Sequence, residues 1–337
     1  MNCAEICFEV AKIIPESFLV GGAVRDTLLN KEPKDFDFAT PLSPDEIETA
    51  IQNSGRHAYS IGKRFGTVGV KINGIMVEIT TFRSEKYEEG NRKPQVEFVK
   101  DINSDLSRRD FTINAMARTV LPEREFIDLF NGQEDMKNKV IRCVGKPKDR
   151  FKEDPLRMLR VARFMSQLEF EVHPDTEETA FEMSYKILEV SKERWCLELD
   201  KLLMTLKPSL GLDFMMRTRL MNFMIPELSL QYSYNQNSPY HSRDLWEHTK
   251  YVVDNVGCDI MLRWAALLHD IAKPFVRYDN NKGYSNYLKH DMLGKEMVIR
   301  LAYYLKWSNE RREVVSNLVL NHMLDTSPLK EADEKGK

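Results

Sequence analysis

Long hydrophobic runs are missing from this chain. No apolar stretch approaches the ~20 residues that a helix needs to cross a bilayer, so no transmembrane segment and no membrane partner are expected. The first residues, MNCAEICFEVAKIIPESF, carry Glu5 and Glu9 within their apolar stretch and have no basic leader. This pattern predicts a helix that runs to Ile14 rather than a signal peptide.

Cysteine is scarce and is not arranged for metal binding or for a disulfide framework. The five cysteines are odd in number and contain no CxxC pair. They predict free thiols in a reducing compartment, for which the cytoplasm is the simplest assignment.

A large excess of charge of one sign is also missing. The net charge of −3 argues against a protein that coats nucleic acid with its whole surface, but it permits a local basic groove. Arginines do cluster locally, at Arg108, Arg109, Arg157, Arg160 and Arg163. With 337 residues, of which 42% are hydrophobic, the chain has the composition of a soluble globular protein of two or three domains.

Helix and strand signals alternate in the first part of the chain and give way to helical signals later. Strands are expected at 18–20 and 36–40, and Asn73-Gly74 between two β-rich stretches suits a type I′ hairpin turn. From Asp154 onward helical periodicity dominates. We therefore expect an α+β head at residues 1–145, an all-α neck at 146–235, a helical region rich in His and Asp at 236–329, and a disordered charged tail at 330–337.

Paired carboxylates in the head suggest a metal site. Asp35 and Asp37 are two residues apart in a short predicted strand, so both side chains are expected on one face. Two such carboxylates can hold a pair of Mg²⁺ ions that activate a hydroxyl and stabilise a leaving pyrophosphate. Glu78, in the second arm of the hairpin, is the candidate third carboxylate. Taken alone, Asp-x-Asp is more often a solvated strand edge.

A glycine turn precedes this pair. Gly21 and Gly22 follow a strand and open a helix, where a backbone without Cβ atoms can approach a phosphate closely. Arg25 could add positive charge toward a triphosphate. A lone Gly-Gly could instead merely end a strand, but Gly-Gly-x-x-Arg-Asp followed by Asp-x-Asp is far more specific.

With these motifs the chain resembles the class II CCA-adding enzyme and bacterial poly(A) polymerase family of the polymerase β nucleotidyltransferase superfamily. The matching stretches, in the family's order, are LVGGAVRD, DFDFAT, IGKRFGTVGV, VEITTFR, DLSRRDFTINAMA, IDLFNG and EDPLRMLRVARF. The resemblance implies a small mixed-sheet head followed by an all-α neck. It also implies two Mg²⁺ ions at the transferase site, with CTP, ATP and the 3′ end of tRNA as partners.

The resemblance assigns roles to further residues. Arg109 would contact the triphosphate, Asp110 the ribose 2′-hydroxyl, and Asn114 would support the turn or touch the ribose. Arg83 resembles the hinge of a flexible loop that extends to Pro94. Asn131 stands where the family usually carries glycine, and asparagine tolerates the left-handed backbone that this turn requires.

In the same family, Asp154 and Arg157 act as a protein template for the incoming base, and Arg160 and Arg163 on the same helix are further candidates for nucleotide binding. Cytosine and adenine both present an amino donor beside a ring-nitrogen acceptor, which one carboxylate and one guanidinium satisfy. Guanine and uracil reverse that pattern and leave charged groups unpaired. Structurally, Asp154 could simply be the N-cap of a helix.

The histidines near the C-terminus resemble the HD superfamily of metal-dependent phosphohydrolases. The matching residues are His248, His269 and Asp270, with His290, His322 and Asp325 as further candidates. Imidazole and carboxylate ligands suit a divalent transition metal. The alternative is an HD fold that is kept for shape or RNA binding without its metal.

Three functions therefore compete: CCA addition to tRNA, poly(A) polymerisation, and an HD phosphohydrolase with an inactive transferase head. The stretch IGKRFGTV resembles the CCA-adding form, because poly(A) polymerases usually replace Gly66 and Thr67. Addition of C alone or of A alone stays open, and the sequence predicts no oligomeric state. Many relatives continue past the HD region into helices that hold the tRNA elbow.

Overall fold

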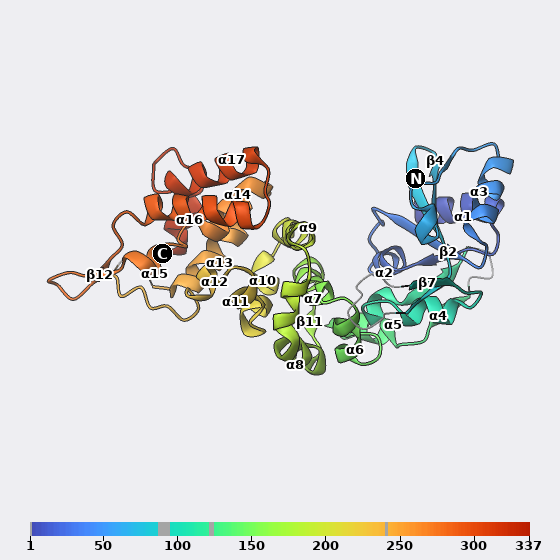
Figure 1. Cartoon of the computed structure of the whole chain (residues 1–337), viewed down its shortest axis with the longest axis horizontal. Coiled ribbons are helices and arrows are strands. Elements are labelled where there is room, and N and C mark those ends of the chain that lie inside the picture. Colours follow the sequence, from blue (N-terminus) through green and yellow to red (C-terminus); the bar gives the residue numbers. More distant parts are fainter. Residues whose placement is uncertain (1, 87–94, 121–124, 240–241) are drawn as a thin grey trace. The chain divides into compact units, whose positions relative to one another are not determined.

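The computed structural model describes residues 2–86, 95–120, 125–239 and 242–337. The chain forms two compact units, Met1–Asp154 and Pro155–Lys337 (Figure 1). The division falls later than the head boundary predicted at residue 145, and the neck and the HD region lie together in the second unit.

The first unit is built on one seven-stranded sheet with the strand order β3-β4-β5-β2-β1-β8-β9. Its strands are β1 (Phe18–Val20), β2 (Phe36–Thr40), β3 (Ala58–Tyr59), β4 (Thr67–Ile72), β5 (Ile75–Thr81), β8 (Met116–Thr119) and β9 (Phe126–Asp128). The β2 and β5 strands run parallel, whereas the other neighbouring pairs are antiparallel, so the predicted mixed sheet is confirmed. The smaller strands are β6 (Arg83–Lys86), which pairs with β7 (Gln95–Phe98), and β10 (Val140–Ile141).

Helices and turns of the first unit begin where the local sequence favours them. The helices are α1 (Cys3–Ile13), α2 (Gly22–Leu28), α3 (Pro44–Asn53), α4 (Ile102–Ser107), α5 (Gly132–Lys137) and α6 (Pro147–Glu153). Ser43 caps α3 and forms a capping box with Glu46, which satisfies free backbone donors at the helix start. The hairpin turn at Asn73 and Gly74 has positive φ at both residues, as type I′ geometry requires.

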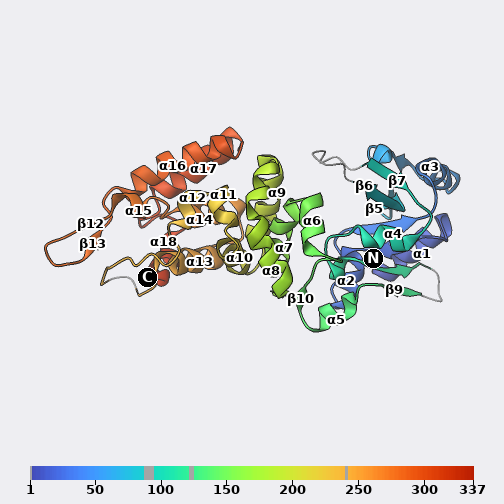
Figure 2. The ribbon, with the colours of Figure 1, turned by 60° about the horizontal axis from the view of Figure 1, so that its bottom comes forward.

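The second unit is helical (Figure 2). Its elements are α7 (Leu156–Leu168), β11 (Glu171–Val172), α8 (Pro174–Met183), α9 (Lys192–Leu203), α10 (Pro208–Arg217), α11 (Leu220–Met224), α12 (Pro226–Ser229), α13 (Leu245–Asn255), α14 (Ile260–Leu268), α15 (Lys273–Val276), β12 (Tyr278–Asp279), β13 (Ser285–Asn286), α16 (His290–Tyr304), α17 (Asn309–Leu320) and α18 (Lys330–Gly336). Its core includes the fully buried Trp195, Trp246 and Trp264. Among the residues that the structure describes, no helix combines the length and apolar character that crossing a bilayer requires.

The prediction of a disordered tail at 330–337 is wrong. These residues form α18, whose Ala332, Asp333 and Gly336 are buried in contact with the rest of the unit. The backbone carbonyls of Gly336 and Lys337 accept hydrogen bonds from residues 243 and 242, respectively. The charged composition predicted disorder, but most of the charged side chains lie on the exposed side of a helix that packs against α13, and only Asp333 is buried.

Candidate functional sites

The parallel pairing of β2 and β5 determines where the carboxylates of the head lie. Asp37 lies in β2 directly opposite Glu78 in β5, and Asp35 lies just before β2, whose first residue is Phe36. The side chains of all three are exposed. Although Asp37 keeps solvent contact, the surrounding protein raises its pKa, and the like charges of Glu78 and Asp35 raise it further, while Arg109 opposes them. The three carboxylates thus form one electrostatically linked group.

An oxygen-only donor set of this kind suits a hard divalent cation such as Mg²⁺. The three carboxylates are not drawn together as tightly as a metal-ligand cluster. In the described part of the chain, sets of three or more potential ligand atoms within 4.8 Å of one another occur in the second unit and not at Asp35, Asp37 and Glu78.

The glycine turn provides room for Arg109. Gly21 adopts φ +67°, and a Cβ atom added there would lie 2.8 Å from the Nη1 atom of Arg109. The backbone conformation therefore favours glycine, and any side chain at this position would have to displace the guanidinium of Arg109. Arg109 Nη1 also donates to the backbone carbonyl of Asn114 at 3.4 Å. The predicted triphosphate contact is consequently packed against the predicted phosphate-binding turn.

Arg25 does not point into solvent. Its side chain is only 5% exposed, and its Nη1 atom donates to Asn114 Oδ1 at 2.7 Å, while Asp26 accepts two further hydrogen bonds. The amide of Asn114 donates in turn to Asp110 Oδ1 at 3.1 Å. Arg25 thus orients Asn114 and, through it, Asp110, which is the residue expected to contact the ribose.

Asp105 is a residue that sequence reasoning missed. Its carboxylate is 1% exposed and accepts hydrogen bonds from Arg108 Nη2 at 2.7 Å and from Arg109 Nη2 at 3.0 Å. Burial would raise the pKa of Asp105, but the two guanidinium groups lower it below its ordinary value. The backbone N–H of Arg83 also approaches this carboxylate, at 3.4 Å. The Asp-x-x-Arg-Arg spacing on a helix could have revealed this network.

The predicted loop from Arg83 to Pro94 lies largely outside the described residues. Arg83 itself is placed at the start of β6, and its Nη1 atom donates to the carbonyl of Phe65 at 2.6 Å. Asn131 has φ 57° and ψ 38°, so the prediction that it adopts the left-handed conformation is confirmed.

Asp154 and Arg157 occupy the junction between α6 and α7. Asp154 is extended and ends the first unit, and α7 begins at Leu156 with Pro155 as its N-cap residue. The expectation that Asp154 caps this helix is therefore wrong by one residue. Arg157 lies in the first turn of α7 and is 8% exposed.

Arg160 and Arg163 are held by Glu198 of α9. The buried carboxylate of Glu198 accepts from Arg163 Nε at 2.7 Å and lies 3.8 Å from Arg160 Nη1. Arg163 also stacks on the ring of Phe164, with 4.0 Å between the guanidinium carbon and the ring centroid. The structure therefore brings both arginines together on one face of α7 and fixes them there.

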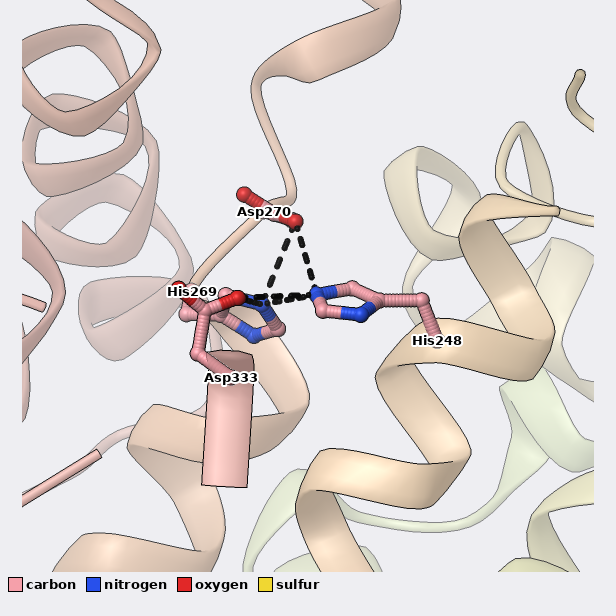
Figure 3. A group of neighbouring side chains, drawn as sticks. All are labelled: His248, His269, Asp270 and Asp333. Atoms are coloured by element: carbon pink, nitrogen blue, oxygen red, sulfur yellow. Dashed lines mark hydrogen bonds and ion pairs between the residues drawn. The ribbon is translucent and has the colours of Figure 1, made fainter. Parts of the chain in front are cut away.

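The HD residues converge in the interior of the second unit. His248 comes from α13, His269 and Asp270 from the turn after α14, and Asp333 from α18 (Figure 3). The Nε2 atom of His248 lies 3.3 Å from Asp270 Oδ2 and 3.1 Å from Asp333 Oδ1. His269 Nε2 lies 3.1 Å from the same Asp270 oxygen. These four side chains form one potential metal-ligand cluster.

A second cluster shares Asp270. Its other carboxylate oxygen, Oδ1, lies 3.3 Å from His290 Nε2 and 3.8 Å from His322 Nε2. His290 is the first residue of α16 and His322 follows α17. Because the two oxygens of Asp270 face different histidine pairs, this carboxylate stands between two ligand sets.

The histidine tautomers fit metal binding. The Nδ1 atoms of His269, His290 and His322 lie 2.6–2.8 Å from backbone carbonyls, which fixes a proton on Nδ1 and leaves Nε2 as a lone-pair donor in the neutral ring. Nε2 atoms then face each other at 3.2 Å between His290 and His322. Neither oxygen of Asp270 accepts a well-oriented hydrogen bond from the described residues. Converging lone pairs of this kind favour a bound cation.

Charge in the metal-free cluster is distributed unevenly. Burial would lower the pKa of His248, but Asp270 and Asp333 raise it to about 9. Burial and the neighbouring His269 lower the pKa of His322 to about 4. Asp270 also raises the pKa of His290 against the effect of burial, so divalent cations must displace protons from His248 and His290.

Asp325 does not take part in these clusters. Its side chain is 94% exposed and pairs with Lys330 at 2.7 Å. Asp333 contributes the carboxylate that the sequence interpretation placed at Asp325. It was missed because its segment was expected to be disordered.

Three family models match the chain. One described as the poly A polymerase head domain matches residues 17–142, one described as the probable RNA and SrmB-binding site of polymerase A matches 169–231, and one for the HD domain matches 240–335. The predicted order of an α+β head, a helical neck and a helical HD region is confirmed in these segments.

Among curated proteins, the chain is similar to CCA-adding enzymes. It is 42% identical to that of Bacillus subtilis (strain 168) over 206 residues, which are 61% of this chain and 50% of the relative. It is 38% identical to that of Bacillus velezensis over 260 residues, which are 75% of this chain and 60% of the relative. The chain thus spans about half the length of the curated relatives it matches.

Solved structures point the same way. A Bacillus stearothermophilus CCA-adding enzyme in complex with CTP has a TM-score of 0.68 and 25% identity, with 100% of this chain and 82% of that chain covered. A tRNA nucleotidyltransferase complexed with a primer tRNA and an incoming ATP analog has a TM-score of 0.62 and 27% identity, with coverages of 98% and 96%. The resemblance inferred from the motifs is confirmed.

Proposed function

We propose that this chain adds CMP and AMP to the 3′ end of tRNA in the cytoplasm, where its tRNA substrates are found. The observation that carries the proposal is the register of β2 and β5, which sets Asp37 opposite Glu78 in electrostatic reach of Arg109. The similarity to CCA-adding enzymes supports this assignment over poly(A) synthesis and over a chain with an inactive head.

In this mechanism Asp35, Asp37 and Glu78 would hold two Mg²⁺ ions, which when bound activate the RNA 3′-hydroxyl and neutralise the leaving pyrophosphate. Arg109, held by Asp105 against Gly21, positions the triphosphate. Asp110 accepts a hydrogen bond from the ribose 2′-hydroxyl and so favours ribonucleotides. Catalysis follows from positioning and charge neutralisation, without a covalent enzyme intermediate.

Base choice would depend on Asp154 and Arg157, with Arg160 and Arg163 adding positive charge along α7. One carboxylate and one guanidinium satisfy the amino group and the ring nitrogen of cytosine or adenine. Uracil and guanine leave both protein groups unpaired, at ~1–3 kcal/mol each. Changing Arg157 should therefore alter base choice more than it slows the reaction.

The decisive experiment supplies CTP and ATP, separately and together, to tRNA that lacks its CCA end and to an oligo(A) primer. Completion of CCA on tRNA supports the proposal. A long ladder of A on either substrate supports poly(A) polymerisation, and one nucleotide type only supports C-only or A-only addition. Asp37→Asn is the matched inactive control, because it keeps the side-chain shape but removes the charge. Substantial turnover by this variant would contradict the carboxylate assignment.

For the HD region we propose a metal-dependent phosphohydrolase that uses a divalent transition metal. The converging Nε2 atoms and the shared Asp270 support this second activity. His248, His269, Asp270 and Asp333 would hold one cation, and Asp270, His290 and His322 a second. When bound, these cations would supply an activated water. Metal analysis and hydrolysis of bis(p-nitrophenyl) phosphate test it, with Asp270→Asn as control. A metal-free, inactive chain that still folds would favour an HD region kept for shape or RNA binding.

A further inference from the structure

The β12–β13 hairpin between α15 and α16 exposes aromatic side chains. Tyr278 begins β12 and Tyr284 directly precedes β13, and these side chains are 46% and 43% exposed. Phe275, just before the hairpin, is 51% exposed. Figures 1 and 2 show the hairpin projecting from the helices of the second unit. We call residues 277–289 the arm.

The arm is positively charged, unlike the chain as a whole. It carries Arg277, Lys282 and Lys289 against a single acid, Asp279, which gives a net charge of 3 − 1 = +2, whereas the chain carries −3. Asp279 accepts a hydrogen bond from Ser285 at 2.6 Å, and its Oδ1 atom lies 3.5 Å from Arg277 Nε. Aromatic side chains interleaved with cations are the combination that binds single-stranded nucleic acid by stacking and phosphate contacts.

Several hydrogen bonds fix the base of the arm. The N–H of Ser285 donates to the carbonyl of Asn237 at 2.9 Å, and the side chain of Asn237 donates to the carbonyl of Gly283 at 3.0 Å. Arg277 Nη1 donates to the carbonyl of Asn235 at 3.3 Å. The segment before α13 therefore forms hydrogen bonds to both sides of the hairpin. These bonds fix the position of the hairpin that carries the exposed tyrosines.

The arm is joined directly to the metal-ligand clusters. The carbonyl of Tyr287 accepts from His290 Nδ1 at 2.7 Å, and the Tyr287 hydroxyl donates to the carbonyl of Gln236 at 2.6 Å. The Gln236 side chain accepts from Lys273 Nζ at 3.0 Å, and Lys273 lies 2.7 Å from Asp270 Oδ2. A continuous set of hydrogen bonds and ion pairs thus connects the arm to the shared carboxylate.

We propose that the arm binds single-stranded RNA, with bases stacked on Tyr278 and Tyr284 and phosphates held by Arg277 and Lys282, beside the HD clusters. This inference rests on the proposed HD phosphohydrolase and deepens it by naming single-stranded RNA as its substrate class. A lipid surface fits less well, because the turn Asn280-Asn281-Lys282-Gly283 is too polar to insert into a bilayer.

Photo-crosslinking of the full chain locates the RNA. Trypsin cleaves after Arg277, Lys282 and Lys289, so the arm is released as two peptides, 278–282 and 283–289. With a single-stranded RNA that contains 4-thiouridine, we expect crosslinks in these two peptides and fewer with the same sequence as a duplex. Crosslinks that leave both peptides unlabelled overturn the proposal.

The double variant Tyr278→Ala/Tyr284→Ala tests the stacking. Loss of crosslinking into 278–282 and 283–289 is expected. Binding of a fluorescent single-stranded RNA should be at least about thirty-fold weaker, because each of the two stacked bases contributes about five-fold or more. Tyr303→Ala is the matched control, since Tyr303 is a 65% exposed tyrosine on α16 outside the arm. Lys282→Gln should reduce the slope of log affinity against log salt by about 0.7. Metal content and circular dichroism verify that each variant folds.

Unchanged RNA binding by the double variant overturns the proposal, as does a preference for anionic phosphatidylserine vesicles that the two substitutions abolish. The transferase proposal and the HD proposal are tested by assays that differ from those for the arm. Absent CMP addition by the unaltered chain contradicts the transferase assignment, and absent metal contradicts the HD assignment, whereas crosslinks in peptides 278–282 and 283–289 report on the arm.

Discussion

At the scale of single residues, Gly21 shows how one missing Cβ atom determines the position of a functional group. Its positive φ and the 2.8 Å approach of Arg109 are two separate demands on the same position. Gly74 offers a natural comparison, because it also has positive φ (+87°) but has no atoms within 4 Å of an added Cβ.

We expect Gly21→Ala to lower kcat/KM for CTP by about ten-fold or more, because the new methyl group displaces Arg109 as well as straining the backbone. Gly74→Ala carries a backbone strain of ~1–2 kcal/mol without that contact, so it should lower stability and leave kcat/KM nearly unchanged. Steady-state kinetics and urea unfolding of both variants distinguish the two effects. Equal losses of kcat/KM would show that backbone strain alone is responsible.

Asp105 also positions Arg109, because its carboxylate accepts a hydrogen bond from Arg109 Nη2. We expect Asp105→Asn to raise KM for CTP and ATP more than it lowers kcat, because the guanidinium loses its charged partner while the metal carboxylates are untouched. Leaving a buried charge without its partner costs several-fold to a hundred-fold, about 1–3 kcal/mol. Asp101→Asn is the comparison, since Asp101 caps the same helix without touching Arg109. An unchanged KM in Asp105→Asn would contradict the positioning role.

At the scale of elements, α18 completes the HD cluster. This short C-terminal helix delivers Asp333 to within 3.1 Å of His248, and Gly336 lets the helix approach so closely that an added Cβ would lie 2.9 Å from the same imidazole. The cluster therefore requires an element that is far from its other ligands in the sequence.

In the metal-free chain, Asp333→Asn should lower the pKa of His248 from about 9 toward its ordinary value of 6.5. The sign follows from the partner, because a carboxylate favours the protonated imidazole and its removal disfavours it. Nuclear magnetic resonance titration of histidine-labelled protein measures this shift, and the exposed carboxylate variant Asp325→Asn should leave it unchanged. A His248 titration that is unaffected by Asp333→Asn would contradict the assigned contact.

At the scale of the whole molecule, the division into two units can be followed with the natural fluorophores. All four tryptophans, Trp195, Trp246, Trp264 and Trp307, lie in the second unit. Tryptophan fluorescence therefore reports on unfolding of the unit that carries the HD clusters, while the sheet of the first unit contributes to the far-ultraviolet circular dichroism.

We expect Mn²⁺ to shift the fluorescence-detected unfolding transition to higher urea, because a cation that binds only the folded clusters stabilises them by about 2.7 kcal/mol at one hundred times its dissociation constant. Chelator should reverse the shift. Asp270→Asn should abolish it, because this carboxylate serves both ligand sets. A shift that persists in Asp270→Asn would place the stabilising cation elsewhere.

Much of the fold and of the site could be predicted because the signals are local. The alternation of apolar residues and the Asn73-Gly74 turn specify the β4–β5 hairpin, and the parallel pairing with β2 then sets Glu78 opposite Asp37. The His and Asp pairs of the HD region are likewise adjacent or nearly so in the sequence. Local patterns are readable because the backbone geometry that they encode repeats within a few residues.

The sequence by itself therefore determined the order of the head, neck and HD regions and named most of the candidate site residues. Only the tertiary structure decided that Arg25 is buried as a support for Asn114, that Asp105 fixes Arg109, and that Asp333 rather than Asp325 joins the histidines. The physical reason is that burial and charge pairing depend on which distant segments cover a side chain. The sequence of a charged helix predicts that it is solvated, and only the structure shows that another helix packs against it.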